Sequence, residues 1–183
     1  TNDINKVSYN NSIFAALLTP QGKYLNEFFI IQSNKGYLLD CSENSTGELI
    51  KDLSKYKLRS NVEINDLSTK FVVGVINVLK FQELQKELKV NDNTIVYRDT
   101  PIFLDPRNKE LGARIISNLE KLYLTIKKLS LSIIDSKKYY SLAHKLGVPE
   151  KGLLNLKDQL FGLEANFETC LLYTSDAADE SVR

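Results

Sequence analysis

Short runs of apolar and β-branched residues, separated by turn residues, fill the first forty positions of the chain. Residues 14–19 and 24–32 are two such runs. The segment Pro20-Gln21-Gly22-Lys23 between them is typical of a turn, because Pro fixes φ and Gly accepts a positive φ. After the polar segment "SNKG", residues 37–42 form a third run. The pattern predicts three β-strands joined by two short turns.

Residues 44–60, "NSTGELIKDLSKYKLRS", have the periodicity of an α-helix. Leu49 and Leu53 recur at helical spacing and would lie on one face. Ser45 and Glu48 have the spacing of a capping box. The end of the segment is basic, which is favourable beside the negative pole of a helix dipole. A patch that binds phosphate or nucleic acid is the alternative interpretation of these cations.

The middle of the chain mixes strand and helix patterns without a regular alternation. Residues 61–66 and 70–77 are predicted to form a strand pair. Residues 80–90 are amphipathic and are either a helix or a variable insertion. Residues 94–117 are predicted to be strand, turn and strand, whereas residues 118–134 fit a helix and a strand equally well.

Residues 135–150, "DSKKYYSLAHKLGVPE", carry clear start and stop signals for a helix. Asp135 or Ser136 would cap its start, Gly147 would end it, and Pro149 prevents its continuation. Together these elements predict an α+β fold with mainly antiparallel sheets and packed helices. The irregular order of strands and helices and the lack of a Gly-rich phosphate loop argue against a Rossmann fold.

Composition narrows the class of protein. The 183 residues are 43% apolar and 26% charged, which is typical of one ordinary globular domain. The net charge of +1 gives no global attraction to nucleic acid or membrane, although a local basic patch remains open. No apolar run approaches the roughly 20 residues of a membrane helix, so no membrane partner is expected.

Residues that could carry catalysis or bind metal are few. His144 is the one histidine, and Cys41 and Cys170 form no CxxC pair. These counts predict no metal site, no disulfide framework and a reducing compartment. The sequence also contains none of the motifs GxSxG, GxxxxGK[ST] or HExxH.

Four stretches, taken in order, resemble the YgfZ-type folate-binding proteins. They are "LLTPQGKYLNEFFII", "LIKDLSKYKLRSNVEI", "IFLDPRNKELGARII" and "LGVPEKGLLNLKDQLFGLEANF". This family is related to the glycine-cleavage T-protein and includes the mitochondrial iron–sulfur cluster assembly factor. The opening "TNDI" is similar to the family's "QGxxTND" segment. The resemblance covers roughly residues 1–168.

The resemblance implies α+β lobes arranged like a ring around a channel that binds tetrahydrofolate or another reduced folate. It implies an accessory protein for the assembly or repair of iron–sulfur enzymes, including tRNA-modifying ones, without classical turnover. The implied partners are folate and iron–sulfur client or assembly proteins, with an indirect link to tRNA. The full-length protein would be a monomer in the bacterial cytoplasm or, alternatively, the mitochondrial matrix.

Two other function classes stay open. One is an aminomethyltransferase of the glycine-cleavage type, a folate-dependent enzyme that transfers one-carbon groups. The other is an RNA-contacting module that uses the basic segment "KYKLRS", for which strongly salt-dependent affinity would be the mark.

The end of the chain departs from the family pattern. The hallmark segment K-G-C-Y-x-G-Q-E, which should follow "LEAN", is absent, and Cys170 does not stand in such a context. Residues 170–183 contain no Lys, Asn or Ile and resemble the translation of a sequencing adapter. We therefore expect residues 1–169 to be a folate-binding domain truncated at both ends, and residues 170–183 to be a non-native read-through tail. No catalytic residue is assigned.

Asn26 and Glu27 lie where the T-protein relatives have two acidic residues, one of which is placed at the reactive nitrogen of folate. An amide cannot act as a base, so Asn26 puts aminomethyl transfer in doubt, while it can still hydrogen-bond a pterin. Alternation along a strand would point Glu27 to the opposite face from Asn26. The alternative is a pair of exposed polar residues on a strand.

Three further residues are predicted to bind folate. Asp105 and Arg107 of "LDPR" would face the channel, with Arg107 placed for a carboxylate such as the glutamate tail; a solvated turn is the alternative. Arg114 would complete a cationic cluster or lie at the surface. Glu164 of "GLEAN" would lie near the active centre, or Asn166 would pin a loop. The aromatic residues that could stack on a pterin, or pack in the core instead, are Tyr24, Phe28, Phe29, Tyr37 and Tyr139.

Overall fold

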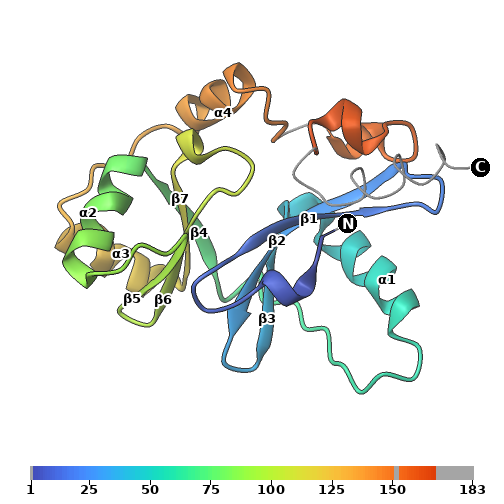
Figure 1. Cartoon of the computed structure of the whole chain (residues 1–183), viewed down its shortest axis with the longest axis horizontal. Coiled ribbons are helices and arrows are strands. Elements are labelled where there is room, and N and C mark those ends of the chain that lie inside the picture. Colours follow the sequence, from blue (N-terminus) through green and yellow to red (C-terminus); the bar gives the residue numbers. More distant parts are fainter. Residues whose placement is uncertain (1, 151–152, 168–183) are drawn as a thin grey trace, which may run out of the picture.

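Two antiparallel sheets lie next to each other in the computed structural model, which describes residues 2–150 and 153–167. The first sheet, with helix α1, occupies the right half of Figure 1, and the second sheet, with helices α2 and α3, occupies the left half. The predicted α+β class with antiparallel sheets is confirmed. The proposed tail, residues 170–183 with Cys170, lies outside the described residues.

The first sheet is a meander of β1 (Ile13–Leu18), β2 (Tyr24–Ser33) and β3 (Gly36–Asp40). The three predicted strands are therefore confirmed. Leu17 pairs with Asn26 but Leu18 pairs with Tyr24, so β2 carries one extra residue at this point. This bulge turns Tyr24 to the face of β2 that Phe29 also occupies, where both rings join one apolar core.

Helix α1 (Thr46–Lys57) covers the other face of the first sheet, where Leu49 packs with Ala15 and Phe28. The predicted helix is confirmed, but the prediction that Ser45 and Glu48 form a capping box is wrong. Ser45 already has helical backbone angles, because it ends a 3-10 turn that continues into α1. Its hydroxyl donates to the carbonyl of Ser42 at 2.8 Å instead of accepting a bond from the helix.

The second sheet contains β4 (Val72–Ile76), β5 (Thr94–Tyr97), β6 (Thr100–Leu104) and β7 (Ala113–Ser117), in the order β4-β7-β6-β5. Residues 94–104 hold two strands instead of the predicted one. They are joined at Arg98 and Asp99, which both take a positive φ.

The strand predicted for residues 61–66 is wrong. The segment has no regular structure, and among the described residues the only strand beside β4 is β7. Val62 is exposed, so the few apolar residues of this segment bury no common face that could hold it in a sheet.

Helices α2 (Val78–Leu88) and α3 (Leu119–Lys128) lie on the second sheet, and α4 (Ser136–Lys145) follows at the top of Figure 1. Asn77 caps α2 and Asn118 caps α3, because each side chain accepts a hydrogen bond from a backbone N–H group of its helix. The helical alternative for residues 80–90 is thus correct, and the ambiguous residues 118–134 hold a helix followed by an irregular connection.

The start and stop signals of α4 were predicted correctly. The Asp135 carboxylate accepts the backbone N–H of Lys137 at 2.9 Å, and Gly147 has a positive φ just after the last turn. No helix in the described part of the chain has the length and apolar character that crossing a membrane requires.

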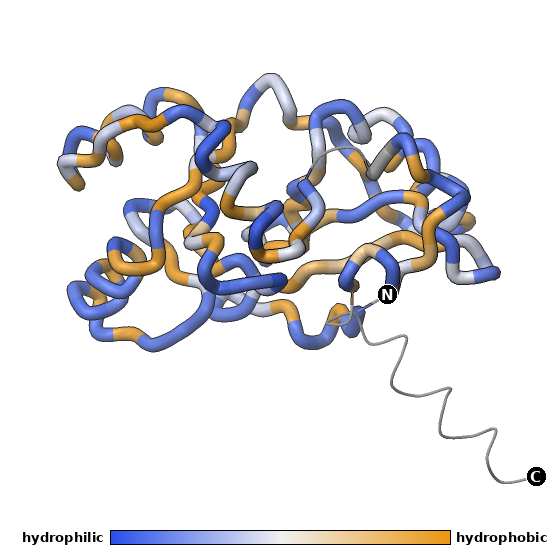
Figure 2. Tube along the Cα trace, turned by 90° about the horizontal axis from the view of Figure 1, so that it is seen from above, coloured by the Kyte–Doolittle hydropathy of each residue, from blue (hydrophilic) through white to orange (hydrophobic). Residues whose placement is uncertain are grey.

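An apolar core joins the two sheets. Phe103 of β6 and Ile116 of β7 pack against Phe14, Phe29 and Ile31 of the first sheet. In Figure 2, apolar residues gather along the central segments of the trace, and the outer turns are largely hydrophilic. The seam between the sheets is therefore a water-poor environment for any charged group that lies in it.

Candidate functional site

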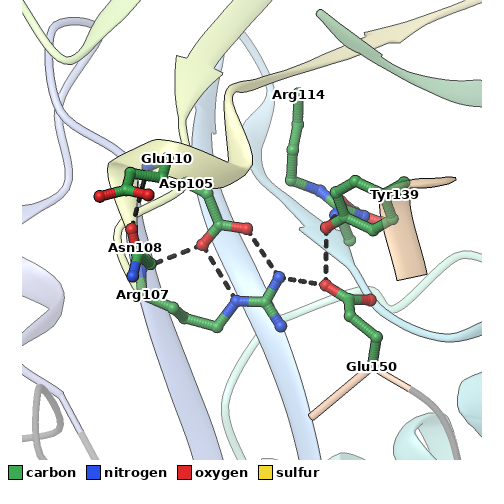
Figure 3. A network of polar contacts seen from close by, with 8 residues as sticks. Asp105, Arg107, Asn108, Glu110, Arg114, Tyr139 and Glu150 are labelled. Atoms are coloured by element: carbon green, nitrogen blue, oxygen red, sulfur yellow. Dashed lines mark hydrogen bonds and ion pairs between the residues drawn. The ribbon is translucent and has the colours of Figure 1, made fainter. Parts of the chain in front are cut away.

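Charged side chains from several parts of the chain meet at this seam. Figure 3 shows most of the cluster, which lies between β6, β7 and the end of α4. We call this set the seam cluster; its members are Asp40, Asp105, Arg107, Arg114, Tyr139 and Glu150.

Arg107 is the centre of the seam cluster. Its Nε donates to Oδ1 of Asp105 at 3.0 Å, and its Nη2 donates to Oδ2 at 2.6 Å, so the ion pair is bidentate. The same Nη2 also donates to Glu150. The side chains of Arg107 and Asp105 are only 8% and 1% exposed, so both charges are held away from water.

The turn predicted at residues 105–108 positions this pair. The backbone N–H of Arg107 donates to Oδ1 of Asp105 at 3.0 Å, which is the local turn chemistry expected of an aspartate. The solvated Arg107 of the alternative interpretation is wrong, because the guanidinium is buried. Burial alone would lower the pKa of Arg107, but the hydrogen bond and charge of Asp105, and the charge of Glu150, raise it above its usual value.

Arg114 forms the second half of the cluster. Its Nε donates to Oδ2 of Asp40 at 2.7 Å, and its Nη1 donates to the hydroxyl of Tyr139 at 3.3 Å. Of the two alternatives for Arg114, the surface position is wrong, because the side chain is only 13% exposed and is paired with Asp40. The guanidinium carbons of Arg107 and Arg114 lie 4.7 and 4.6 Å from the ring centre of Phe29, so both cations contact one aromatic ring.

Glu150 links the end of α4 to the turn after β6. One of its carboxylate oxygens accepts bonds from Arg107 and from the hydroxyl of Tyr139, the latter at 2.7 Å. Burial and the neighbouring charge of Glu150 raise the pKa of Tyr139, so this hydroxyl stays protonated as a donor.

Glu27 faces the seam cluster from β2. Its Oε2 atom is buried and has no hydrogen-bond partner among the described residues. Burial raises the pKa of Glu27, while a hydrogen bond with Tyr24 and the charge of Arg107 act in the opposite direction. The structure therefore brings Glu27, Asp105 and Arg107 together, and leaves Glu27 with an unused polar atom.

Asn26 lies on the opposite face of β2, as strand alternation predicted. The side chain is fully buried, and its Nδ2 donates to Asp52 of α1 at 3.2 Å. Lys55 and Lys157 also bond the Asp52 carboxylate. The Oδ1 atom of Asn26 has no partner within the described ranges. The alternative of two exposed strand residues is wrong, and Asn26 and Glu27 do not share a site.

Glu164 lies apart from the seam cluster. Its side chain is exposed and accepts the backbone N–H of Phe161 at 2.8 Å, which closes a 3-10 turn. Asn166 donates to the carbonyl of Gly147 at 2.6 Å, so it pins this loop as the alternative interpretation stated. A cavity of about 200 Å³ lies between Arg107, the segment after α4 and Phe167.

Asp40 and Glu150 were missed by the sequence analysis. Each lies far along the chain from its arginine, at separations of 74 and 43 residues, and no local pattern marks either one. The aromatic candidates are divided by the structure: Tyr24, Phe28 and Phe29 are buried in the core, Tyr37 is exposed, and Tyr139 belongs to the seam cluster. Within the described residues no group of His, Cys, Asp and Glu could hold a metal ion.

Replacing Glu27 with glutamine should make folding stability less dependent on pH. The folded-state pKa of Glu27 is raised, so its contribution to stability is fully present below the unfolded-state pKa and is lost as the pH rises through the folded-state pKa. Glutamine has the same shape without the charge. Urea unfolding should show equal stabilities near pH 4 and a variant that is more stable than the wild type at pH 8. A less stable variant at pH 8 would mean that Tyr24 and Arg107 outweigh burial and the charge of Glu150.

Comparison with known proteins shows a similarity over part of the chain. No family model matches the sequence. Over 69 residues the chain is 33% identical to "Iron-sulfur cluster assembly factor IBA57 homolog, mitochondrial" of Mycosarcoma maydis. The match covers 34% of this chain and 17% of that protein.

Proposed function

We propose that this chain belongs to a folate-binding accessory protein of iron–sulfur cluster assembly. The observation that carries the proposal is the similarity over 69 residues to a protein named as such an assembly factor. The iron–sulfur enzymes that it serves would include tRNA-modifying ones. The iron–sulfur cluster would be cargo of the process and not a resident group of this chain.

A reduced folate fits one feature of the seam. The pterin ring presents several N–H donors, and the unpartnered Oε2 of Glu27 is an acceptor in a water-poor environment. Glu27 would hold and orient the ring. Arg107 would act by keeping the carboxylates around it neutralised, because its Nε and Nη2 are bonded to Asp105 and Glu150. When bound, folate supplies a carrier for one-carbon groups.

An aminomethyltransferase is less well supported. A group that takes a proton from an amine has to be a base, and Asn26 carries an amide at the position where the enzymes have an acid. Asn26 is also turned toward Asp52 and α1, on the face of β2 away from the seam cluster. Glu27 is the carboxyl that remains, and the structure supports a binding role for it.

Titration with tetrahydrofolate, kept reduced and followed by calorimetry, tests the folate part of the proposal. The full chain should bind, and Glu27→Ala should weaken binding at least tenfold through loss of the buried acceptor. Glu63→Ala is the matched control: it removes an exposed carboxylate outside the seam cluster and should change the affinity less than threefold. Equal binding by Glu27→Ala and the wild type, or no binding by the wild type, would contradict folate recognition at the seam.

The proposed role in iron–sulfur cluster assembly is tested by a separate experiment in cells. Cells depleted of their own assembly factor should regain the activity of a [4Fe–4S] enzyme when they express this chain. Failure to restore that activity, with folate binding intact, would leave a folate-binding protein without the proposed role in assembly.

A further inference from the structure

Helix α3 and the connection from α3 to α4 expose apolar side chains among lysines. Leu119 of α3 is 70% exposed, and Ile133 and Ile134 in the connection to α4 are 82% and 61% exposed. Tyr123 and Leu124 of α3 are exposed as well. We call these five residues the α3 patch. It lies on the left-hand half of Figure 1, away from α1.

Positive charge is concentrated in the same segment. Residues 119–138 contain five lysines against one glutamate and one aspartate, a net charge of +3. The whole chain carries only +1, so the rest of the chain is net negative. Within α3, the Lys127 ammonium lies 4.5 Å from the ring centre of Tyr123, so cationic and apolar groups are presented from one helix face.

Two of the lysines occupy positions that the fold itself disfavours. Lys137 and Lys138 are exposed in the first turn of α4, where the helix dipole makes a positive charge unfavourable. They stand three and four residues after the exposed Ile134, beyond the capping Asp135. An external anion would satisfy both lysines, and neighbouring apolar material would cover both isoleucines.

We propose that the α3 patch docks on an anionic lipid surface. The lysines would contact the headgroups, and the aliphatic side chains would enter the boundary with the acyl chains. The aliphatic content favours lipid over RNA, since Leu and Ile gain nothing from a phosphate backbone and the ring of Tyr123 is already covered by Lys127. The attachment is peripheral and independent of the folate proposal.

Co-sedimentation of the full chain with vesicles tests this surface. Vesicles of phosphatidylcholine with about 30% phosphatidylserine should bind the chain at least tenfold more tightly than phosphatidylcholine alone, and 0.5 M NaCl should remove most of the difference. Lys137→Glu/Lys138→Glu should lower the affinity about tenfold or more. Ile133→Ser/Ile134→Ser should also lower the affinity for these vesicles although the net charge is unchanged. This variant separates insertion of apolar side chains into the lipid from electrostatic attraction to the headgroups.

The matched control reverses two exposed lysines elsewhere. Lys35→Glu/Lys51→Glu makes the same change in net charge at the turn before β3 and on α1, and should retain the wild-type affinity within about twofold. Circular dichroism melts would establish that all variants are folded. Equal binding to both kinds of vesicle, no binding to either, or equal loss in both lysine variants would overturn the proposal. Salt-sensitive binding to RNA without binding to vesicles would overturn it in favour of a nucleic-acid surface.

Discussion

Replacing Arg107 with alanine is expected to lower the free energy of unfolding by about 3–5 kcal/mol, because it leaves buried acids without their cation. Asp105 is 1% exposed and has its bidentate partner removed, and Glu150 loses one of its two donors. The variant also loses the contact of the guanidinium with Phe14 and Phe29. Urea unfolding at pH 7 would measure the difference.

Two further variants separate charge from packing. Adding Asp105→Asn to Arg107→Ala removes one of the unpaired charges and should recover part of the lost stability, so the two changes should not be additive. Lys80→Ala breaks the exposed ion pair with Glu83 and should cost less than about 0.5 kcal/mol. A cost below about 1 kcal/mol for Arg107→Ala would show that the seam cluster does not hold the two sheets together.

The second large effect is expected at Gly112, where alanine should destabilise the fold by about 3 kcal/mol or more. Gly112 has φ of 90° and ψ of −155°, a region that is essentially restricted to glycine. A Cβ there would also overlap the backbone carbonyl oxygen of Ile76 in β4, which cannot move without breaking its pairing with β7. Thermal and urea unfolding of the purified variant would measure the loss.

Gly47→Ala is the control for this prediction. Gly47 lies in α1, and a Cβ added there meets nothing within 4 Å. Alanine should therefore stabilise the protein by about 0.5 kcal/mol through its helix propensity. If Gly112→Ala changed the free energy of unfolding as little as Gly47→Ala, the loop before β7 would be able to take another backbone conformation at little cost. Arg114, two residues later, would then not be positioned by Gly112.

Local patterns predicted those elements whose signals are complete within a few residues. The β1–β2 hairpin has apolar strands on both sides of a Pro-Gln-Gly turn, and α4 has both a capping aspartate and a terminating glycine. The predictions failed where residues outside the local pattern determine the conformation. Ser45 has the sequence of a cap, but the preceding 3-10 turn already sets its backbone.

In the candidate site, too, local contacts were predicted and contacts between distant residues were not. Asp105 and Arg107 are two residues apart, so a turn motif was enough to pair them. Asp40 reaches Arg114 only when the two sheets meet, and Glu150 reaches Arg107 only when the segment after α4 packs on the turn after β6. No local pattern encodes either contact. Alternation correctly separated Asn26 from Glu27, but it could not say that the inner face of β2 would lie against a second sheet.

The position of β4 at the edge of the second sheet has a consequence for the order of assembly. Its one described strand partner is β7, and the pairing of Val72 with Ser117 closes a loop of about 45 residues. The first sheet, by contrast, needs only short turns between successive strands. Because closing a long loop costs entropy before any contact compensates for it, the meander is the natural nucleus of this chain. Strand β4 then joins late.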